Sequence, residues 1–185
     1  MEKRENEMRK QKGFSLIELL IVVAIILIIA AIAIPNLLRA RIAANESSAV
    51  SSIRTINTAE VTYQSAYPTV GYTATLGELG PGGPSAVCAV PTSTNACLID
   101  SALSNATATT TPKSGYYFAI QSTGAGAGGL VLDYTVGGAA AAFNQTGVRS
   151  FCSSEDGVIH QSVPGAQDDP TTYVASVCNP LAIIQ

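Results

Sequence analysis

Residues that could carry out nucleophilic chemistry gather in the last third of the chain. His160 is the only histidine of the 185-residue sequence, and Cys152, Glu155 and Asp156 precede it closely. A cysteine and a histidine within reach of each other can form an activated nucleophile. Cys152, however, is expected in a disulfide, and a lone strand histidine more often packs or faces solvent. We therefore expect no catalytic residue and interpret the protein as a non-enzyme.

Two other patterns look like binding motifs but lack the context that such motifs need. Gly124, Gly126 and Gly129 have G-x-G-x-x-G spacing, yet a strand is expected after them, whereas a dinucleotide site needs a helix there. We interpret them as a hairpin loop. One histidine and no C-x-x-C pair argue against zinc. The acidic pairs at 155–156 and 168–169 are too few and unpatterned to indicate calcium, so no metal and no cofactor are expected.

The charged residue in the least expected place is Glu18. It lies in an apolar run of 21 residues, from Phe14 to Ile34, that contains no other charge. A helix of that length spans ~31 Å, about the thickness of a bilayer's hydrocarbon core. An ionised carboxylate inside a bilayer costs at least ~2–3 kcal/mol. The run predicts a membrane-spanning helix in which Glu18 must have a specific purpose.

Charge differs on the two sides of this run. Residues 1–13 hold five basic and three acidic side chains, a net charge of +2, whereas residues 14–185 hold five basic and ten acidic ones, a net charge of −5. A basic flank predicts a cytoplasmic N-terminus with the remainder outside, although Arg39 and Arg41 weaken that signal. The acidic exterior portion argues against nucleic-acid binding, which needs clustered Lys and Arg.

All four cysteines lie in this exterior portion, where exported compartments oxidise thiols. Three pairings of four cysteines are possible. We favour Cys88–Cys97, which closes a short loop containing turn-forming residues, and Cys152–Cys178, which would tie the C-terminal tail to a strand.

A second helical segment is predicted over residues 35–67. Pro35 lacks a backbone N–H and is expected to kink or loosen the helix just after the apolar run. Beyond it, apolar residues recur at steps of three, four and seven, which indicates a helix with one face on a core. These residues are Ile42, Ala49, Ile53, Ile56, Tyr63 and Tyr67. Asn45 and Glu46 are expected on other faces, and the helix is expected to end before Pro68.

The remainder predicts a loop followed by a sheet. Residues 68–114 are rich in Gly, Pro, Ser and Thr, which is typical of a surface loop, here stapled by the first disulfide. Residues 115–185 contain short strand patterns joined by connections too short for crossover helices, so the sheet should be antiparallel. The candidate strands are 116–121, 130–136, 147–152 and 157–163, and residues 139–143 could be a further strand or a loop. The predicted fold class is α+β.

The N-terminal sequence KGFSLIELLIVV combines several of these features. A short charged leader ends at Gly13, Phe14 follows, Glu18 lies four residues later, and Pro35 comes directly after the apolar run. This pattern resembles the processing site of type IV prepilins with a class III-type leader, and of the related pseudopilins. The resemblance covers residues 1 to about 67.

The resemblance implies a pilin-like fold and an assembly mechanism. A prepilin peptidase would cut off the leader, residues 1–13, between Gly13 and Phe14, and the new Phe14 amine would be methylated. The subunit would wait in the inner membrane until a platform protein and a cytoplasmic ATPase drive copies of it into an extracellular filament. There, the Glu18 carboxylate of one subunit is expected to meet the Phe14 amine of the next. Pro35 is expected to loosen the helix so that neighbouring subunits fit together.

Three alternatives remain open at this point. A pseudopilin of a type II secretion system shares this N-terminus but often carries a calcium site in a late loop. An ordinary signal peptide cut after Ala33 would release a globular protein, although the apolar run is longer than a typical signal core. A single-span anchored protein that never polymerises would also fit the run.

Overall fold

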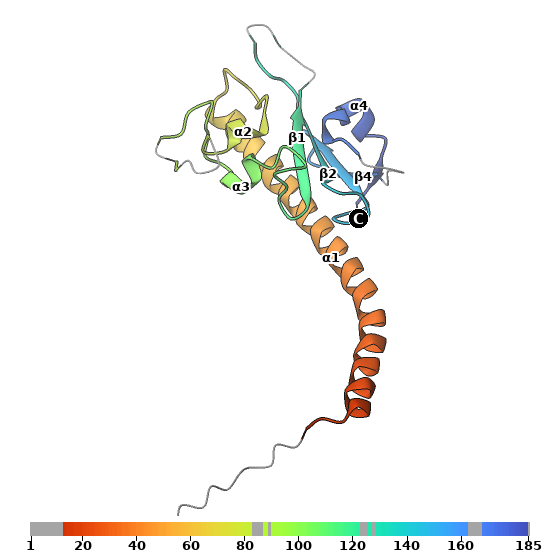
Figure 1. The fold of residues 1–185 in the computed structure, drawn as a ribbon. Coiled ribbons are helices and arrows are strands. Elements are labelled where there is room, and N and C mark those ends of the chain that lie inside the picture. Colours follow the sequence, from red (N-terminus) through yellow and green to blue (C-terminus); the bar gives the residue numbers. More distant parts are fainter. Residues whose placement is uncertain are drawn as a thin grey trace, which may run out of the picture. The chain divides into compact units, whose positions relative to one another are not determined.

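The computed structural model describes residues 13–82, 87–88, 90–122, 126, 129–162 and 168–184. The chain forms two compact units, one up to Leu38 and one from Arg39 onward. A single helix, α1 (Leu16–Ala66), contributes to both (Figure 1). The expected leader, except Gly13, and Gly124 of the glycine motif lie outside the described residues.

Helix α1 joins the two helical segments expected from the sequence into one element. It continues through Pro35, whose missing N–H leaves the Ala31 carbonyl without its usual helical donor. It ends at Ala66, directly before Tyr67 and Pro68, as the restricted conformation of a residue before proline predicts.

The C-terminal half of α1 packs into the second unit along the expected stripe. Ala49, Ile53, Ile56 and Tyr63 are buried, and the outer stripe residues at 42 and 67 are half-buried. The prediction that Glu46 lies on another face is wrong, because only 6% of Glu46 is exposed.

Within the described residues, five strands form one antiparallel sheet in the order of the chain. They are β1 (Tyr116–Gln121), β2 (Thr135–Ala140), β3 (Ser150–Ser154), β4 (Ile159–Ser162) and β5 (Ala182–Ile183). The expected α+β class with an antiparallel sheet is confirmed.

The second strand lies later than the alternation of residues 130–136 predicts. Residues 130–134 form no strand except for an isolated bridge between Val131 and Gly71. All six residues of β2 are buried, so β2 has no alternating pattern to detect. A Cβ at Gly138 of β2 would lie 2.9 Å from the Phe118 ring and 3.4 Å from Ile53 of α1. Glycine there lets the sheet approach the helix closely.

Residues 68–114 are more than the surface loop that their composition predicts. They contain two short helices, α2 (Leu76–Leu79) and α3 (Ser101–Ser104). Leu76, Leu79 and Leu103 are at most 2% exposed and join the main core. Helices of four residues are too short to give a periodic signal, so composition alone does not reveal them.

The C-terminal region packs against β1, β2 and β3 and forms a second, smaller core. It contains a 3₁₀ turn, η1 (Pro170–Thr172), and a short helix, α4 (Ala175–Cys178). Buried Cys152, Tyr173 and Cys178 pack together there. Within the second unit, Figure 1 shows α2 and α3 on one flank of the strands and α4 on the other.

The cysteines form two disulfides, Cys88–Cys97 and Cys152–Cys178. These are the two pairs that the sequence favours. The second joins β3 to α4, so it ties the C-terminal region to a strand, whereas the first closes a loop within residues 68–114.

Candidate functional site

The first candidate site is the N-terminal end of the first unit. Gly13, Phe14 and Ser15 precede α1 without regular secondary structure, and Phe14 is 84% exposed. A Cβ added at Gly13 would meet no heavy atom within 4 Å. The peptide bond between Gly13 and Phe14 therefore lies in exposed, irregular chain, the kind of segment in which proteolysis is easiest.

Glu18 lies close to this end, in the first turn of α1. It is the only charged residue between Leu16 and Leu38, and it is exposed. The partial positive charge of the helix N-terminus favours a carboxylate at this position. No ion pair of Glu18 occurs within the described parts of the chain, so a cationic partner would have to come from elsewhere.

The apolar side chains that follow are uncovered. From Leu16 to Leu38 every large apolar side chain is between 45% and 80% exposed. An 18-residue window of α1 has a mean hydropathy of 3.3, and none of it is buried. The helix is thus long and apolar enough to cross a membrane. An exposed apolar surface of this size requires lipid or other chains to cover it.

In the second unit, an ion pair with a buried carboxylate fastens α1 to the loop before β3. Arg149 donates to Glu46 Oε2 from Nε at 2.9 Å and from Nη2 at 2.7 Å. The backbone N–H groups of Val148 and Arg149 both donate to Glu46 Oε1 at 3.1 Å. Next to it, Asn45 donates to the Thr146 carbonyl at 2.8 Å. We call the contacts of Asn45 and Glu46 with residues 146–149 the loop clamp.

A second buried acid, Glu60, holds the chain just after α1. Glu60 is completely buried, and its carboxylate accepts hydrogen bonds from the Thr73 N–H at 3.0 Å and from the Thr73 hydroxyl. Burial raises the pKa of Glu60 to about 7, although the two bonds from Thr73 act in the opposite direction. No basic side chain forms an ion pair with it among the described residues.

The sequence analysis missed both acids, although the spacing of the stripe contains a signal for them. Glu46 falls four residues after Ile42 and three before Ala49, and Glu60 falls four after Ile56 and three before Tyr63. Each occupies the middle of a seven-residue step between apolar residues. A helical position flanked in this way lies on the buried face whatever its residue type.

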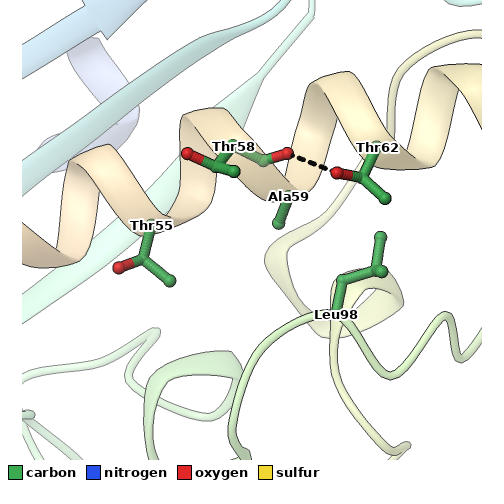
Figure 2. Close-up of a pocket in the computed structure, with 5 residues that line it drawn as sticks. All are labelled: Thr55, Thr58, Ala59, Thr62 and Leu98. Carbon is green, nitrogen blue, oxygen red and sulfur yellow. Dashed lines mark hydrogen bonds between the residues drawn. The ribbon is translucent and has the colours of Figure 1, made fainter.

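A shallow groove of about 240 Å³ lies between α1 and Leu98 (Figure 2). Its α1 wall consists of Thr55, Thr58, Ala59 and Thr62. The hydroxyls of the three threonines donate to carbonyls four residues earlier. Because these polar groups are already bonded within the helix, they give the groove no strong means of recognising a ligand.

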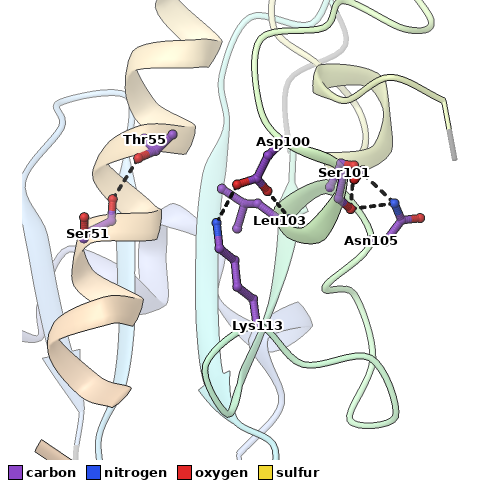
Figure 3. Close-up of polar contacts among 8 residues, drawn as sticks. Ser51, Thr55, Asp100, Ser101, Leu103, Asn105 and Lys113 are labelled. Atoms are coloured by element: carbon purple, nitrogen blue, oxygen red, sulfur yellow. Dashed lines mark hydrogen bonds and ion pairs between the residues drawn. The ribbon is translucent and has the colours of Figure 1, made fainter. Parts of the chain in front are cut away.

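Next to that groove, an ion pair organises the segment after α2. Asp100 caps α3 by accepting from Leu103 N at 2.6 Å, and Lys113 Nζ lies 3.0 Å from its other oxygen (Figure 3). Partial burial alone would raise the pKa of Asp100, but the hydrogen bonds from Lys113 and Leu103 bring it below its ordinary value. This arrangement is structural, since both carboxylate oxygens are occupied.

The residues considered for nucleophilic chemistry come together without forming a nucleophile. Cys152 and His160 are opposite each other in β3 and β4. Cys152 is bonded to Cys178, so it has no thiol to activate. His160 Nδ1 lies 2.9 Å from the Leu181 carbonyl. Across the described residues, no three His, Cys, Asp or Glu side chains are grouped as metal ligands.

Comparison with known proteins identifies the N-terminal segment. A family model described as "Prokaryotic N-terminal methylation motif" matches residues 8–34. Over 40 residues the chain is 68% identical to "Type IV wide pilus major component PilA4" of Thermus thermophilus. The aligned stretch is 22% of this chain and 30% of that protein. Over 54 residues it is 45% identical to "Type IV major pilin protein PilA" of Myxococcus xanthus. This aligned stretch is 29% of this chain and 24% of that protein.

The chain thus matches less than a third of the length of these curated relatives. No solved structure matches it. The similarity lies in the segment that contains the methylation motif and the exposed apolar part of α1, and an antiparallel sheet of the expected class follows that helix. These features together make the N-terminal segment of this chain similar to that of type IV pilins.

Proposed function

We propose that this chain is the structural subunit of a type IV pilus-like extracellular filament, formed after cleavage between Gly13 and Phe14. The observation that carries the proposal is the uncovered apolar half of α1, which follows a methylation motif and contains Glu18 as its only charge. Before assembly this helix anchors the subunit in the membrane. In the filament, the same surface is covered by the helices of other copies.

Moving the apolar half of α1 from lipid into a bundle of helices changes its free energy little. Both surroundings are apolar, so little net hydrophobic free energy is involved, and close packing between helices decides the outcome. Ala24, Ala30, Ala31 and Ala33 permit close approach, and Pro35 loosens the helix just beyond them. A prepilin peptidase, a membrane platform protein and an assembly ATPase are the partners that this function requires.

Glu18 gives the assembly its register. Cleavage creates an amine at Phe14, and methylation leaves that amine charged. Subunits staggered along a filament axis can place the Glu18 carboxylate of one copy against the Phe14 amine of the next. A buried charge without a partner is strongly unfavourable, so only the docking depth that pairs the two charges is stable.

A pilus subunit is favoured over a secretion pseudopilin because both relatives described above are named as major pilus components. The test is electron microscopy of material sheared from cells that produce the chain, with N-terminal mass spectrometry of its main protein. Filaments whose subunit begins at a methylated Phe14 are expected. In a Gly13→Val variant, the added bulk should block the peptidase and uncut precursor should accumulate. A mature N-terminus at Ile34 would instead indicate an ordinary signal peptide.

A further inference from the structure

The charges of the second unit are separated into two regions. Two ion pairs, Arg149–Glu46 and Lys113–Asp100, neutralise two of its basic residues. The remaining basic residues, Arg39, Arg41 and Arg54, are exposed and all belong to α1. Their side chains form no ion pair with any described residue. Most of the acids lie elsewhere, on the segments after the helix.

Arg54 lines a groove of about 280 Å³ between α1 and the beginning of β3. The other walls include Ala43, Ser47, Val50, Phe151 and Ile184. Glu46 and Arg149 also border this groove, but they neutralise each other in the loop clamp. Arg54 is therefore the one lining residue, among those described, whose charge has no partner within the chain. We call this space the Arg54 groove.

An exposed acidic turn lies at the other end of the same strand. Residues 155–158 connect β3 to β4, and Gly157 permits the turn with a φ of +73°. Asp156 is used internally, because its Oδ1 accepts from Ser154 Oγ at 3.1 Å and from Val158 N at 2.9 Å. Glu155 is exposed, and no ion pair occupies it in the described part of the chain.

The Arg54 groove borders the beginning of β3 and the acidic turn follows the end of that strand, and the two features are opposite in charge. Within one copy no ion pair joins Arg54 to Glu155, whereas a second copy displaced along β3 can bring the two charges together. A contact between two different patches of identical copies is heterologous and continues from copy to copy unless it closes into a ring. The arrangement thus suits a filament better than a closed dimer.

We propose that Glu155 of one copy enters the Arg54 groove of a neighbouring copy and pairs with Arg54. The occupant is a second copy of this chain, chosen on charge complementarity. The inference rests on the proposed function, since it names a contact between the second units of neighbouring copies in the same filament. A guanidinium can bind a carboxylate through two parallel hydrogen bonds, and the apolar walls of the groove reduce the screening of that pair by solvent.

The test is a charge exchange in cells that assemble the filament. Arg54→Glu places two carboxylates at the contact, and Glu155→Arg places two guanidinium groups there. Like charges at an interface cost several kcal/mol, so either variant should lower the yield of sheared filaments roughly tenfold or more. The double variant Arg54→Glu/Glu155→Arg restores opposite charges and should recover most of the yield.

Arg41 supplies the matched control, because it is an exposed cation of the same helix that does not line the groove. Arg41→Glu combined with Glu155→Arg should not recover the yield that Glu155→Arg loses. Mass spectrometry of each subunit, for the methylated Phe14 and both disulfides, separates a contact defect from a defect in processing or folding.

A cross-linking experiment tests the contact without reversing any charge. Arg54→Lys introduces an amine in the groove, and a carbodiimide joins an amine to an adjacent carboxylate. Treated filaments should give a ladder of covalent oligomers and a linked peptide pair containing positions 54 and 155. Its absence would overturn the proposed pair.

The outcomes distinguish this inference from the function on which it rests. Absence of filaments from the unaltered chain would overturn the proposed function and the contact together. Normal filaments from the Arg54→Glu variant, or loss in both single variants without recovery in the double variant, would overturn the contact alone.

Discussion

Glu60 is a completely buried acid that forms no ion pair among the described residues. Burial raises its pKa from 4.5 to about 7, against the hydrogen bonds from Thr73, and the charge of Glu78 raises it further. The native state therefore binds a proton at Glu60 more tightly than the unfolded chain does. The stability that this provides is fully present below pH 4.5 and is lost as the pH rises through about 7.

The first prediction is that Glu60→Gln removes this pH dependence. The wild-type free energy of unfolding should fall by about 3 kcal/mol, from this residue alone, between pH 4.5 and pH 8. Glutamine has nearly the same shape and no charge to bury, so the variant should gain relative to wild type as the pH rises. Urea unfolding of the detergent-solubilised chain at both pH values measures the difference. An equal difference at the two pH values would contradict the assignment.

The loop clamp gives the second prediction. Glu46→Ala removes four hydrogen bonds to one carboxylate and leaves the two N–H groups of residues 148 and 149 without an acceptor. We expect a loss of about 2–3 kcal/mol in the free energy of unfolding. Glu46→Gln keeps an oxygen acceptor for those N–H groups and should lose less.

Arg54→Ala is the control for the clamp, because it removes an exposed charge from the same helix without breaking an ion pair. It should change the free energy of unfolding by less than about 0.5 kcal/mol. Amide hydrogen exchange at Val148 and Arg149 provides a local measurement, and it should accelerate in Glu46→Ala only. Unchanged exchange in that variant would show that the clamp does not hold the loop.

At the scale of elements, hydrophobic periodicity predicts those helices in which the apolar pattern repeats over several turns. It does not reveal elements that lack such a repeat. The apolar run and the stripe of α1 were predictable because hydrophobic residues recur over many turns. Strand β2 was misplaced because, being buried on both faces, it lacks alternation. Helices α2 and α3 were missed because four residues are too few to show a period.

The residues of the candidate sites also differ in whether the sequence alone can reveal them. Gly13, Phe14, Glu18 and Pro35 all lie in one short, continuous segment, so a local sequence motif could reveal them. The partners of Glu46 lie 102 and 103 residues away, and sequence spacing contains no information about such a pairing. The stripe could have shown that Glu46 and Glu60 are buried, but only the fold shows what each one contacts.

The third prediction ranks the two disulfides. Closing a chain of 26 residues between Cys152 and Cys178 stabilises by about 3.5 kcal/mol, and closing 9 residues between Cys88 and Cys97 by about 2.6 kcal/mol, on the chain-entropy account. Replacing Cys152 and Cys178 by serine should therefore destabilise the second unit more than replacing Cys88 and Cys97. Urea unfolding of both double variants measures this.

The exposure of the cysteines also predicts which of the two disulfides is reduced first. Cys152 and Cys178 are completely buried, whereas Cys88 is exposed. Limited reduction followed by alkylation and mass spectrometry should label Cys88 and Cys97 first. Earlier labelling of Cys152 would contradict the burial seen in the structure.

At the scale of the whole molecule, the fourth prediction concerns Glu18. In Glu18→Ala, the chain should still enter the membrane, be cut after Gly13 and form both disulfides, because these steps need the leader, the apolar run and the second unit. Filament yield should fall at least tenfold, because the Phe14 amine of each neighbour loses its counter-charge in an apolar surrounding.

Leu19→Ala is the matched control, since it alters the neighbouring residue without changing charge and should leave filaments largely intact. Shearing, electron microscopy and N-terminal mass spectrometry together give the result. Abundant normal filaments from Glu18→Ala would refute the role in register. Accumulation of uncut Glu18→Ala precursor would instead show that the peptidase reads this residue, which would contradict a role confined to assembly.

The uncovered half of α1 also determines how copies find one another. A chain held by an apolar helix in a bilayer diffuses in a plane instead of a volume, always with the same end toward the lipid. It has already lost one direction of translation and most of its freedom to tumble before it meets a neighbour. Since lost translation and rotation are the main entropic cost of association, each encounter begins with much of that cost already met. In the proposed assembly the membrane is thus an oriented, two-dimensional store of subunits, and weak contacts between the second units suffice to select the correct neighbour.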